Sequence, residues 1–409
     1  MIFYALYHTT ANFRHLFFTI YSYVFSDILV DMKKTIYFDN AASTMVRDEV
    51  IQVMLRVMKE DYGNPHSMHE QGRKASRVLD CARKNIADAL GVSPKNLLFT
   101  SGGTEANNLA TLGVIPKLSF RGKHIITSKI EHSAVLEPIK SLEASGWEVS
   151  YLSPNEKGVI SAESFASALR DDTVFASIML VNNEVGSLNP INKYAAEIKK
   201  RGLNTILHTD AVQGLCKIAF TASTLGADLI AVSSHKLHGP TGAGALFVSD
   251  KAKLSPLLLG GPHEGGKRAG TEALLAIAGF GEAVRLASSE LSETSLKVSN
   301  LRKLAVDLLT KKLPNAVFLG NNGSPFLLTL SLPGFKGEVL MNYLDGNGIC
   351  VSRGAACKKG ARSRILEAMG LNNDIIDGAL RVSFSKYSTS DEVKCFVDTL
   401  VIASKALIR

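Results

Sequence analysis

The sequence predicts an α/β protein with a large three-layer α/β/α domain around a mostly parallel sheet, followed by a smaller α+β domain. From Met32 to about Glu290, apolar strand-like runs alternate with helical patterns, which is typical of parallel strands joined by crossover helices. Such sheets are covered by helices on both faces. Beyond Glu290 the alternation stops, and 409 residues with 46% hydrophobic content suffice for two domains.

The strand-like runs of the large domain are short and apolar, and segments of helical periodicity separate them. Strands are expected at 96–100, 124–127, 149–152, 175–181, 205–209, 229–233 and 245–248. Helices are expected at 105–114, 134–145, 162–170 and 193–201.

The smaller domain begins with a long helix over 293–313, which ends at Pro314 because proline cannot continue a helix. Further elements are expected at 326–332 (strand), 337–346 (helix), 349–352 (strand) and near the C-terminus (helix). We expect the large domain to span 46–290 and the small domain to combine 32–45 with 291–409.

Composition narrows the class of protein. The net charge of +8 is modest for this length and the charges are interspersed, which argues against direct nucleic-acid binding but leaves acidic partners plausible. The five cysteines are odd in number and lack CxxC spacing, so no disulfide framework or metal site is expected. This cysteine usage favours a reducing compartment and a cytoplasmic location.

The first 31 residues are rich in Phe and Tyr and differ from the rest of the chain. Their apolar stretch is too short to span a bilayer comfortably, and they contain no basic region or small-residue cleavage site of a signal peptide. We expect residues 1–31 to stand outside the fold, with Met32 as its start and no membrane partner. A weak membrane anchor is the alternative, and whether this extension is translated stays open.

Polar side chains follow several predicted strands at their carboxyl ends, where ligands bind in an open parallel sheet. The run from Ser233 to Gly239 places Lys236 beside His235, and a lysine there can form a Schiff base with an aldehyde cofactor. Gly103 and Thr104 open a helix after an earlier strand, where backbone N–H groups suit a phosphate.

Other strand ends supply groups that could hold a flat ring. Asp210 could pair with a protonated pyridine nitrogen, and Gln213 or Asn183 could donate to a ring hydroxyl, while His132 could stack on the ring. Taken singly, these features also fit a surface lysine, a helix cap and a loop histidine. Their occurrence in order, each at a strand end, indicates a pyridoxal-phosphate site.

These motifs give the chain a family resemblance. It resembles cysteine desulfurases of the NifS/IscS type, which are pyridoxal 5'-phosphate enzymes of fold type I in the aminotransferase class V superfamily. The matching segments run from residue 32 to the C-terminus and include 37–44, 63–67, 101–105, 131–132, 182–186, 210–213, 233–239, 268–271 and 379–381.

The resemblance implies roles for individual residues. Lys236 would hold the cofactor and move a proton, with His132 stacked on the ring and also catalytic. The other cofactor contacts would come from Gly103, Thr104, Asn183, Asp210, Gln213, Ser233 and His235, and from Thr271 across a homodimer interface. Arg381 and Asn40 would bind the substrate, since a planar guanidinium suits a carboxylate.

The resemblance also singles out Cys357, which lies in a loop of small residues over 351–360. A cysteine in such a loop should be exposed and mobile, as a persulfide-forming nucleophile requires. Nearby cations should favour its thiolate and attract an acidic acceptor. These cations are Arg353, Lys358, Lys359, Arg362 and Arg364.

The sequence departs from the family pattern at three positions: His263 replaces glutamine, Met45 replaces proline, and Arg353 replaces serine or threonine. None of these changes removes a catalytic group. Arg353 alters the charge around Cys357, which leaves the identity of the sulfur acceptor in doubt.

The expected function is that of a cysteine desulfurase. It would convert L-cysteine to L-alanine, place a persulfide on Cys357, and pass the sulfur to an acceptor protein for iron–sulfur cluster assembly or tRNA thiolation. A selenocysteine lyase or aminotransferase of the same superfamily is the alternative, although an aminotransferase would not need Cys357. An inactive assembly scaffold is the non-enzymatic alternative, and retention of Lys236, Asp210 and His132 argues against it.

Overall fold

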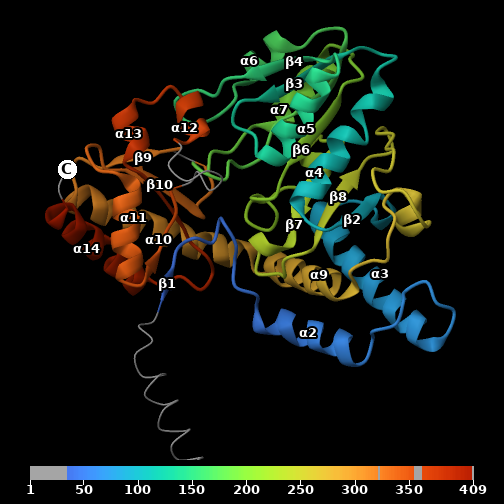
Figure 1. The fold of residues 1–409 in the computed structure, drawn as a ribbon, viewed down its shortest axis with the longest axis horizontal. Coiled ribbons are helices and arrows are strands. Elements are labelled where there is room, and N and C mark those ends of the chain that lie inside the picture. Colours follow the sequence, from blue (N-terminus) through green and yellow to red (C-terminus); the bar gives the residue numbers. More distant parts are fainter. Residues whose placement is uncertain (1–34, 321–322, 354–361, 408–409) are drawn as a thin grey trace, which may run out of the picture.

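The computed structural model describes residues 35–320, 323–353 and 362–407, and its large domain is built on a seven-stranded sheet (Figure 1). The strand order is β2-β8-β7-β6-β5-β3-β4. The strands are β2 (Leu97–Thr100), β3 (His124–Ser128), β4 (Glu148–Leu152), β5 (Thr173–Ser177), β6 (Ile206–Asp210), β7 (Leu229–Ser233) and β8 (Gly244–Val248). All are mutually parallel except β8, which is antiparallel to β2 and β7, so the predicted mostly parallel sheet is confirmed.

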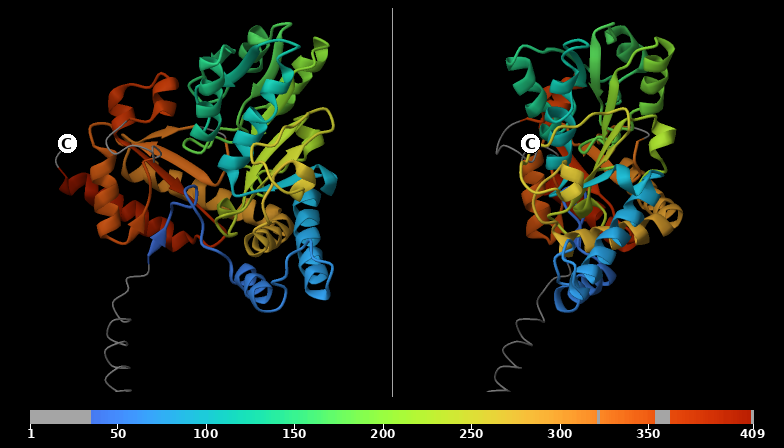
Figure 2. Two further views of the ribbon diagram at one scale, coloured as in Figure 1. Left: turned by 45° about the vertical axis from the view of Figure 1, so that its right-hand side comes forward. Right: turned by 90° about the vertical axis from the view of Figure 1, so that its right-hand side faces the viewer.

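Helices cover both faces of this sheet, which gives the predicted three layers (Figure 2). Neighbouring strand residues point to opposite faces, so Ile125 and Ile126 belong to different apolar clusters. One face packs on α4 (Gly103–Leu112) and α5 (Ser133–Ala144). The other face packs on α3 (Glu70–Leu90), α6 (Ala162–Ala168), α7 (Ile191–Lys200), α8 (Ala222–Leu225) and α9 (Leu274–Ser289).

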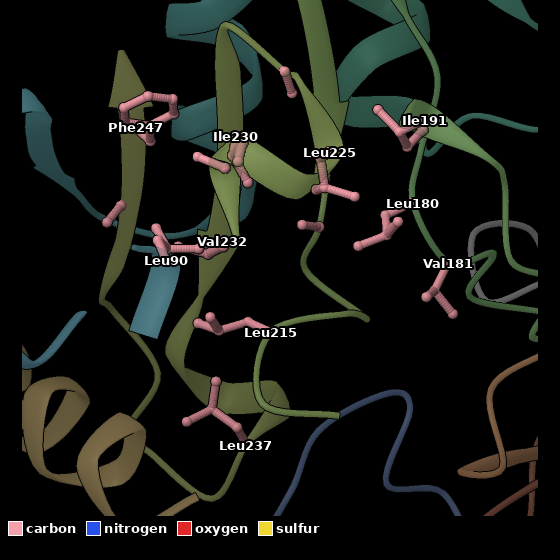
Figure 3. Close-up of a cluster of buried hydrophobic side chains, with 14 of the residues drawn as sticks. Leu90, Leu180, Val181, Ile191, Leu215, Leu225, Ile230, Val232, Leu237 and Phe247 are labelled. Carbon is pink, nitrogen blue, oxygen red and sulfur yellow. The ribbon is translucent and has the colours of Figure 1, made fainter. Parts of the chain in front are cut away.

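The cluster on the second face reaches the turn after β7 (Figure 3). Ile230 and Val232 of β7 lie in it with Leu215 and Leu237, which flank the candidate site. All four side chains are at most 4% exposed. The packed interior therefore extends directly beneath the strand ends where the polar residues gather.

Four helices of the large domain were not predicted: the short α8 together with α2 (Asp48–Lys59), α3 and α9. The last three pack together, with α9 against both α2 and α3. The predicted strand at 175–181 ends at Ser177. Beyond Ser177, the backbone N–H groups of Ile178 and Leu180 still donate to carbonyl oxygens of β6. The Ile178 carbonyl, however, accepts from the Thr209 hydroxyl, and the regular strand pairing stops there.

The small domain holds a three-stranded antiparallel sheet in the order β12-β10-β9. Its elements are β9 (Val317–Leu319), β10 (Leu327–Ser331), β12 (Ala379–Ser383), α10 (Leu291–Lys312), α11 (Gly337–Gly346) and α14 (Ser390–Ala406). The strands β9 and β12 were not predicted. A separate pair joins β1 (Ile36–Tyr37) to β11 (Ile349–Cys350) in parallel, so the predicted strand at 349–352 is shorter than expected.

The N-terminal residues of the described chain pack into this small-domain core. The Phe38 ring contacts Phe384 and Phe396 edge-on, with centroids 5.4 and 6.0 Å apart. This packing supports the proposed division into 46–290 and 32–45 with 291–409. Two helices do not follow this division: α12 (Arg364–Ala368) and α13 (Asn373–Asp377) belong to the small domain in sequence, but their apolar residues pack in the large-domain cluster.

Within the described residues, no helix combines the length and apolar character needed to cross a membrane. The expectation for residues 1–31 falls outside the described part of the chain.

The contact between α3 and α9 depends on Gly281. A Cβ atom at this position would lie 2.5 and 2.6 Å from Cα and Cβ of Ala82. We expect Gly281→Ala to destabilise the protein by about 1–3 kcal/mol, because overpacking must push the helices apart. The urea midpoint, followed by circular dichroism, measures this change.

Gly346→Ala is the matched control, since nothing lies within 4 Å of a Cβ built at that helical glycine. Its expected effect is neutral or stabilising, because alanine has the better helix propensity. Equal midpoints for the two variants would show that α3 and α9 are not in close contact at Gly281.

Candidate active site

Lys236 lies in a short turn of 3₁₀ helix, Ser234–Lys236, directly after β7. Its Nζ donates to the carbonyl oxygens of Ala41 at 2.8 Å and Ala42 at 2.6 Å. Thr44 fixes this approach, because its backbone N–H and its hydroxyl both donate to the His235 carbonyl. The N-terminal segment thus aims the lysine side chain.

The half-buried Lys236 is accompanied by a buried lysine, Lys217, which was not predicted. Burial, reinforced by the charge of Arg381, lowers the pKa of Lys236 to about 8. Burial and the neighbouring Lys236 lower the pKa of Lys217 to about 7. A lysine with a lowered pKa supplies the neutral amine that nucleophilic chemistry needs.

Asp210 ends β6 and is buried, and this burial raises its pKa. Its carboxylate accepts from Asn107 Nδ2 at 2.7 Å and from the Val212 N–H at 2.9 Å. It forms no ion pair with any described residue. A buried carboxylate without a cationic partner fits the protonated pyridine nitrogen expected there. Asn107 was not predicted.

The other expected ring contacts lie near these groups. Gln213 donates through Nε2 to the Ala41 carbonyl at 2.9 Å and accepts from Lys217 Nζ at 3.1 Å. Asn183 keeps a buried Oδ1 without a partner among the described atoms. His132 is exposed and caps α5, since its Nδ1 accepts from the Ala134 N–H at 3.1 Å. This cap places the ring proton on Nε2 and holds the ring in one orientation.

The expected phosphate site combines the start of α4 with the end of β7. A Cβ atom at Gly103 would lie 2.7 Å from Val212 Cγ2, so any side chain there would force Val212 to move. Thr104 is exposed in the first turn of α4. Burial lowers the pKa of His235 to about 4, which keeps its imidazole neutral. A phosphate placed here could take backbone N–H and hydroxyl donors.

Arg381 in β12 is only 3% exposed. Its Nη1 donates to the Asn183 carbonyl at 2.9 Å and its Nη2 pairs with Asp39 at 2.7 Å, whereas its buried Nε has no described partner. Asn40 donates from Nδ2 to the carbonyls of Tyr37 and Ser383, which leaves Oδ1 as the atom it could offer a substrate. Asp39 was not predicted.

Cys357 lies outside the described residues, but both ends of its loop are placed. On one side, Ser352 exchanges backbone hydrogen bonds with Arg381 at 3.1 and 2.6 Å. On the other, Ser363 donates to the Glu184 carboxylate, and Arg364 donates to the carbonyl oxygens of Lys129 and Glu131. Both ends therefore meet the rim of the pocket, one at Arg381 and the other beside His132.

The remaining cysteines lack the features of a nucleophile. Burial raises the pKa of Cys216 to about 11, and it also raises the pKa of the half-buried Cys350 in β11. Cys81 and Cys395 are exposed on α3 and α14.

Thr271 is exposed, so within one chain it is available to a second subunit. Its segment is tied to α4 by Arg268, whose Nε donates to the Glu105 carboxylate at 2.8 Å. The structure thus brings Lys236, Asp210, Gln213 and Arg381 close together, because Gln213 and Lys236 donate to the same Ala41 carbonyl and the charges of Asp210 and Arg381 act on the pKa of Lys236. Thr271 stands on the outside of the chain.

Comparisons with known proteins agree with this geometry. The Aminotransferase class-V family model matches residues 36–396. Cysteine desulfurase IscS of Dictyoglomus turgidum is 38% identical over 373 residues, covering 90% of this chain and 94% of that protein. Cysteine desulfurase IscS of Methanosarcina thermophila is 40% identical, covering 88% and 89% respectively. A solved NifS-like protein matches with a TM-score of 0.86 and 36% identity, covering 91% of this chain and 100% of that one.

The low pKa of Lys217 predicts a pH dependence of stability. Its ordinary pKa is 10.5 and its pKa in the folded chain is about 7, so the unfolded state binds more protons between these values. Stability of the cofactor-free protein should therefore rise with pH in this window. From pH 7 to pH 9, we expect wild type to gain about 2 kcal/mol more than Lys217→Met.

Urea unfolding of both proteins at the two pH values measures this difference. Because all other titrating groups are shared, the variant serves as the control. Identical gains in the two proteins would mean that Lys217 is not desolvated in the fold.

Proposed function

Because this chain belongs to the class-V aminotransferase family and is a cysteine desulfurase that uses pyridoxal phosphate, we propose that Lys236, Arg381 and Cys357 carry sulfur removal from L-cysteine. The observation that carries this assignment is a half-buried lysine with a pKa of about 8 just after β7, near enough to Asp210 and Arg381 for their charges to act on that pKa. The cofactor, when bound, supplies an electron sink for the substrate α-carbon.

Two sets of residues would hold that cofactor. Asp210 suits the ring nitrogen, with Gln213, Asn183 and His132 around the ring. The phosphate contacts would come from Gly103, Thr104, Ser233 and His235. The neutral His235 can donate from Nε2, because its Nδ1 is 3.3 Å from the Ser43 hydroxyl.

Arg381 would bind the substrate carboxylate. Its Nε is the donor left over, since Nη1 and Nη2 already contact Asn183 and Asp39. Burial strengthens a charge-assisted bond made there. Lys236 would take the α-proton on Nζ as the neutral amine, and the carbonyls of Ala41 and Ala42 would stabilise the resulting ammonium.

Cys357 would act as the nucleophile. Its thiolate forms an S–S bond to the substrate sulfur while the substrate Cβ–S bond breaks. The electron pair stays on carbon, which is protonated to give L-alanine, and the sulfur remains as a persulfide on Cys357.

The sulfur would then pass to an acceptor protein, in iron–sulfur cluster assembly or tRNA thiolation. Two of the five cations near Cys357 are neutralised: Arg353 pairs with Glu338 and Arg362 with Asp377. Within the described part of the chain, Arg364 donates to two carbonyl oxygens and pairs with no carboxylate. An acidic acceptor surface would thus meet Arg364, Lys358 and Lys359, and sulfur transfer that is unaffected by salt would contradict this.

Lys236→Ala should abolish alanine formation and the visible absorption of the bound cofactor under native conditions. Lys217→Met is the matched control, because Lys217 is the other buried lysine with a lowered pKa. It should keep the absorption, although its contact with Gln213 is lost. Absorption that disappears in Lys217→Met and persists in Lys236→Ala would reverse the assignment of the two lysines.

Cys357→Ser should reduce sulfide and alanine release from L-cysteine to background while leaving cofactor absorption intact. Its control is Cys350→Ser, because burial raises the pKa of that nearby thiol and favours its unreactive form. The control should retain activity. Turnover by Cys357→Ser at the wild-type rate would exclude Cys357 as the nucleophile.

We further propose a cytoplasmic homodimer in which Thr271 completes the partner's phosphate site. In mixed dimers of Lys236→Ala and Thr271→Ala chains, one site then carries both defects and the other carries none. We expect the mixture to be more active than the mean of the two parents, because one site of each mixed dimer is intact. A mixture whose activity equals that mean, or a fully active monomer by light scattering, would contradict the shared site.

A further inference from the structure

A cluster of potential metal ligands lies outside the residues given roles above. It combines His66, from the loop between α2 and α3, with His263, in a short turn, and Glu272, just before α9. Their ligand atoms all lie within 4.8 Å of one another. His66 Nε2 is 3.0 and 3.1 Å from the two Glu272 oxygens, and the two imidazoles meet edge-on with centroids 4.8 Å apart.

The burial of these groups favours a bound cation. The Glu272 side chain is 3% exposed, and among the described residues its carboxylate has no lysine or arginine within 4 Å. A buried carboxylate is stable when it is paired or coordinates a metal. His263 adds a buried Nδ1 that has no hydrogen-bond partner among the described atoms. The half-exposed His66 leaves one side of the cluster open to solvent.

The surroundings hold the cluster in place. Glu264, next to His263, has a left-handed backbone with φ of 49° and forms a forked ion pair with Arg83 at 2.6 and 2.9 Å. Its carboxylate also accepts from the Phe99 N–H of β2 at 2.9 Å. In the other loop, the His66 N–H donates to Asn64 Oδ1 at 2.9 Å. Two of the three candidate ligands are therefore positioned by bonds that do not involve the cluster.

We propose that His66, His263 and Glu272 bind a divalent transition-metal ion of the Zn²⁺ type. Two imidazoles and a carboxylate are ligands that Zn²⁺ accepts, with water in the fourth position. Tetrahedral ligands at Zn²⁺ bond lengths lie about 3.3 Å apart, so the His66–Glu272 pair is already near that spacing and His263 must turn inward. The sequence predicted no metal site, because these residues are up to 206 positions apart.

Metal binding here would restrain the segment that carries Thr271, since Thr271 directly precedes Glu272. The competing explanation is a simple ion pair between a protonated His66 and Glu272. The two differ in one observable property: only the metal site binds Zn²⁺ through both imidazoles.

The test is a Zn²⁺ titration in competition with a chromogenic chelator, using cofactor-loaded protein without a polyhistidine tag. All proteins carry Cys357→Ser, so that this thiol cannot bind the ion. We expect one Zn²⁺ per chain in the parent. His66→Ala and His263→Gln should each weaken binding at least about tenfold, since each removes a ligand.

His69→Asn is the matched control, because it removes an imidazole three positions from His66 while asparagine can still cap α3. It should bind Zn²⁺ like the parent, and Zn²⁺ should raise the melting temperature of the parent and this control only. Cofactor absorption equal to that of the parent identifies folded variants. Absence of stoichiometric binding by the parent, or unchanged affinity in His66→Ala and His263→Gln, would overturn the proposal.

Discussion

The active site depends on the way residues 40–47 run across both domains. The carbonyls of Ala41 and Ala42 receive Lys236 Nζ, and Thr44 exchanges hydrogen bonds with His235 and His238. In the same segment, Asn40 donates to the Ser383 carbonyl of β12 in the small domain. One stretch of backbone therefore fixes the distance between the lysine and the strand that bears Arg381. The two groups come from different domains, so no contact within either domain could set that distance.

At the end of this segment, the buried Arg47 takes part in an ion network that also joins the two domains. The Arg47 guanidinium is 3% exposed and forms a fork with Glu290, which also pairs with Lys386. Arg47 lowers the pKa of Glu290 to about 2, so the carboxylate stays charged at any physiological pH. Glu290 stands between α9 and α10, where the sequence pattern changes. Arg47 is the buried member of the pair, and without Glu290 it would keep only the exposed Glu49 as a partner, so loss of Glu290 should be destabilising.

Several cationic side chains gather around Lys236. Lys217 and Arg381 lie near it together with the carboxylates of Asp210 and Asp39, and desolvation disfavours the charges of both lysines. A phosphate-bearing cofactor and a substrate carboxylate would bring the negative charge that balances these cations. Without these ligands, the charged form of each lysine is unfavourable, which is why both lysine pKa values are lowered toward neutral pH. Binding of the two anionic groups would remove this unfavourable energy.

The sequence by itself determined the three-layer fold and the positions of Lys236, Asp210 and Gln213, because apolar runs define strands locally and parallel strands end at one edge of a sheet. Only the tertiary structure decided what surrounds them. Some of these features depend on packing between separate elements: the reversed direction of β8, the contacts of Asn107 and Lys217, and the pairing of Arg353 with Glu338. The local sequence pattern cannot predict such contacts, because the packing of whole helices and strands decides which partners a side chain has and how deeply it is buried.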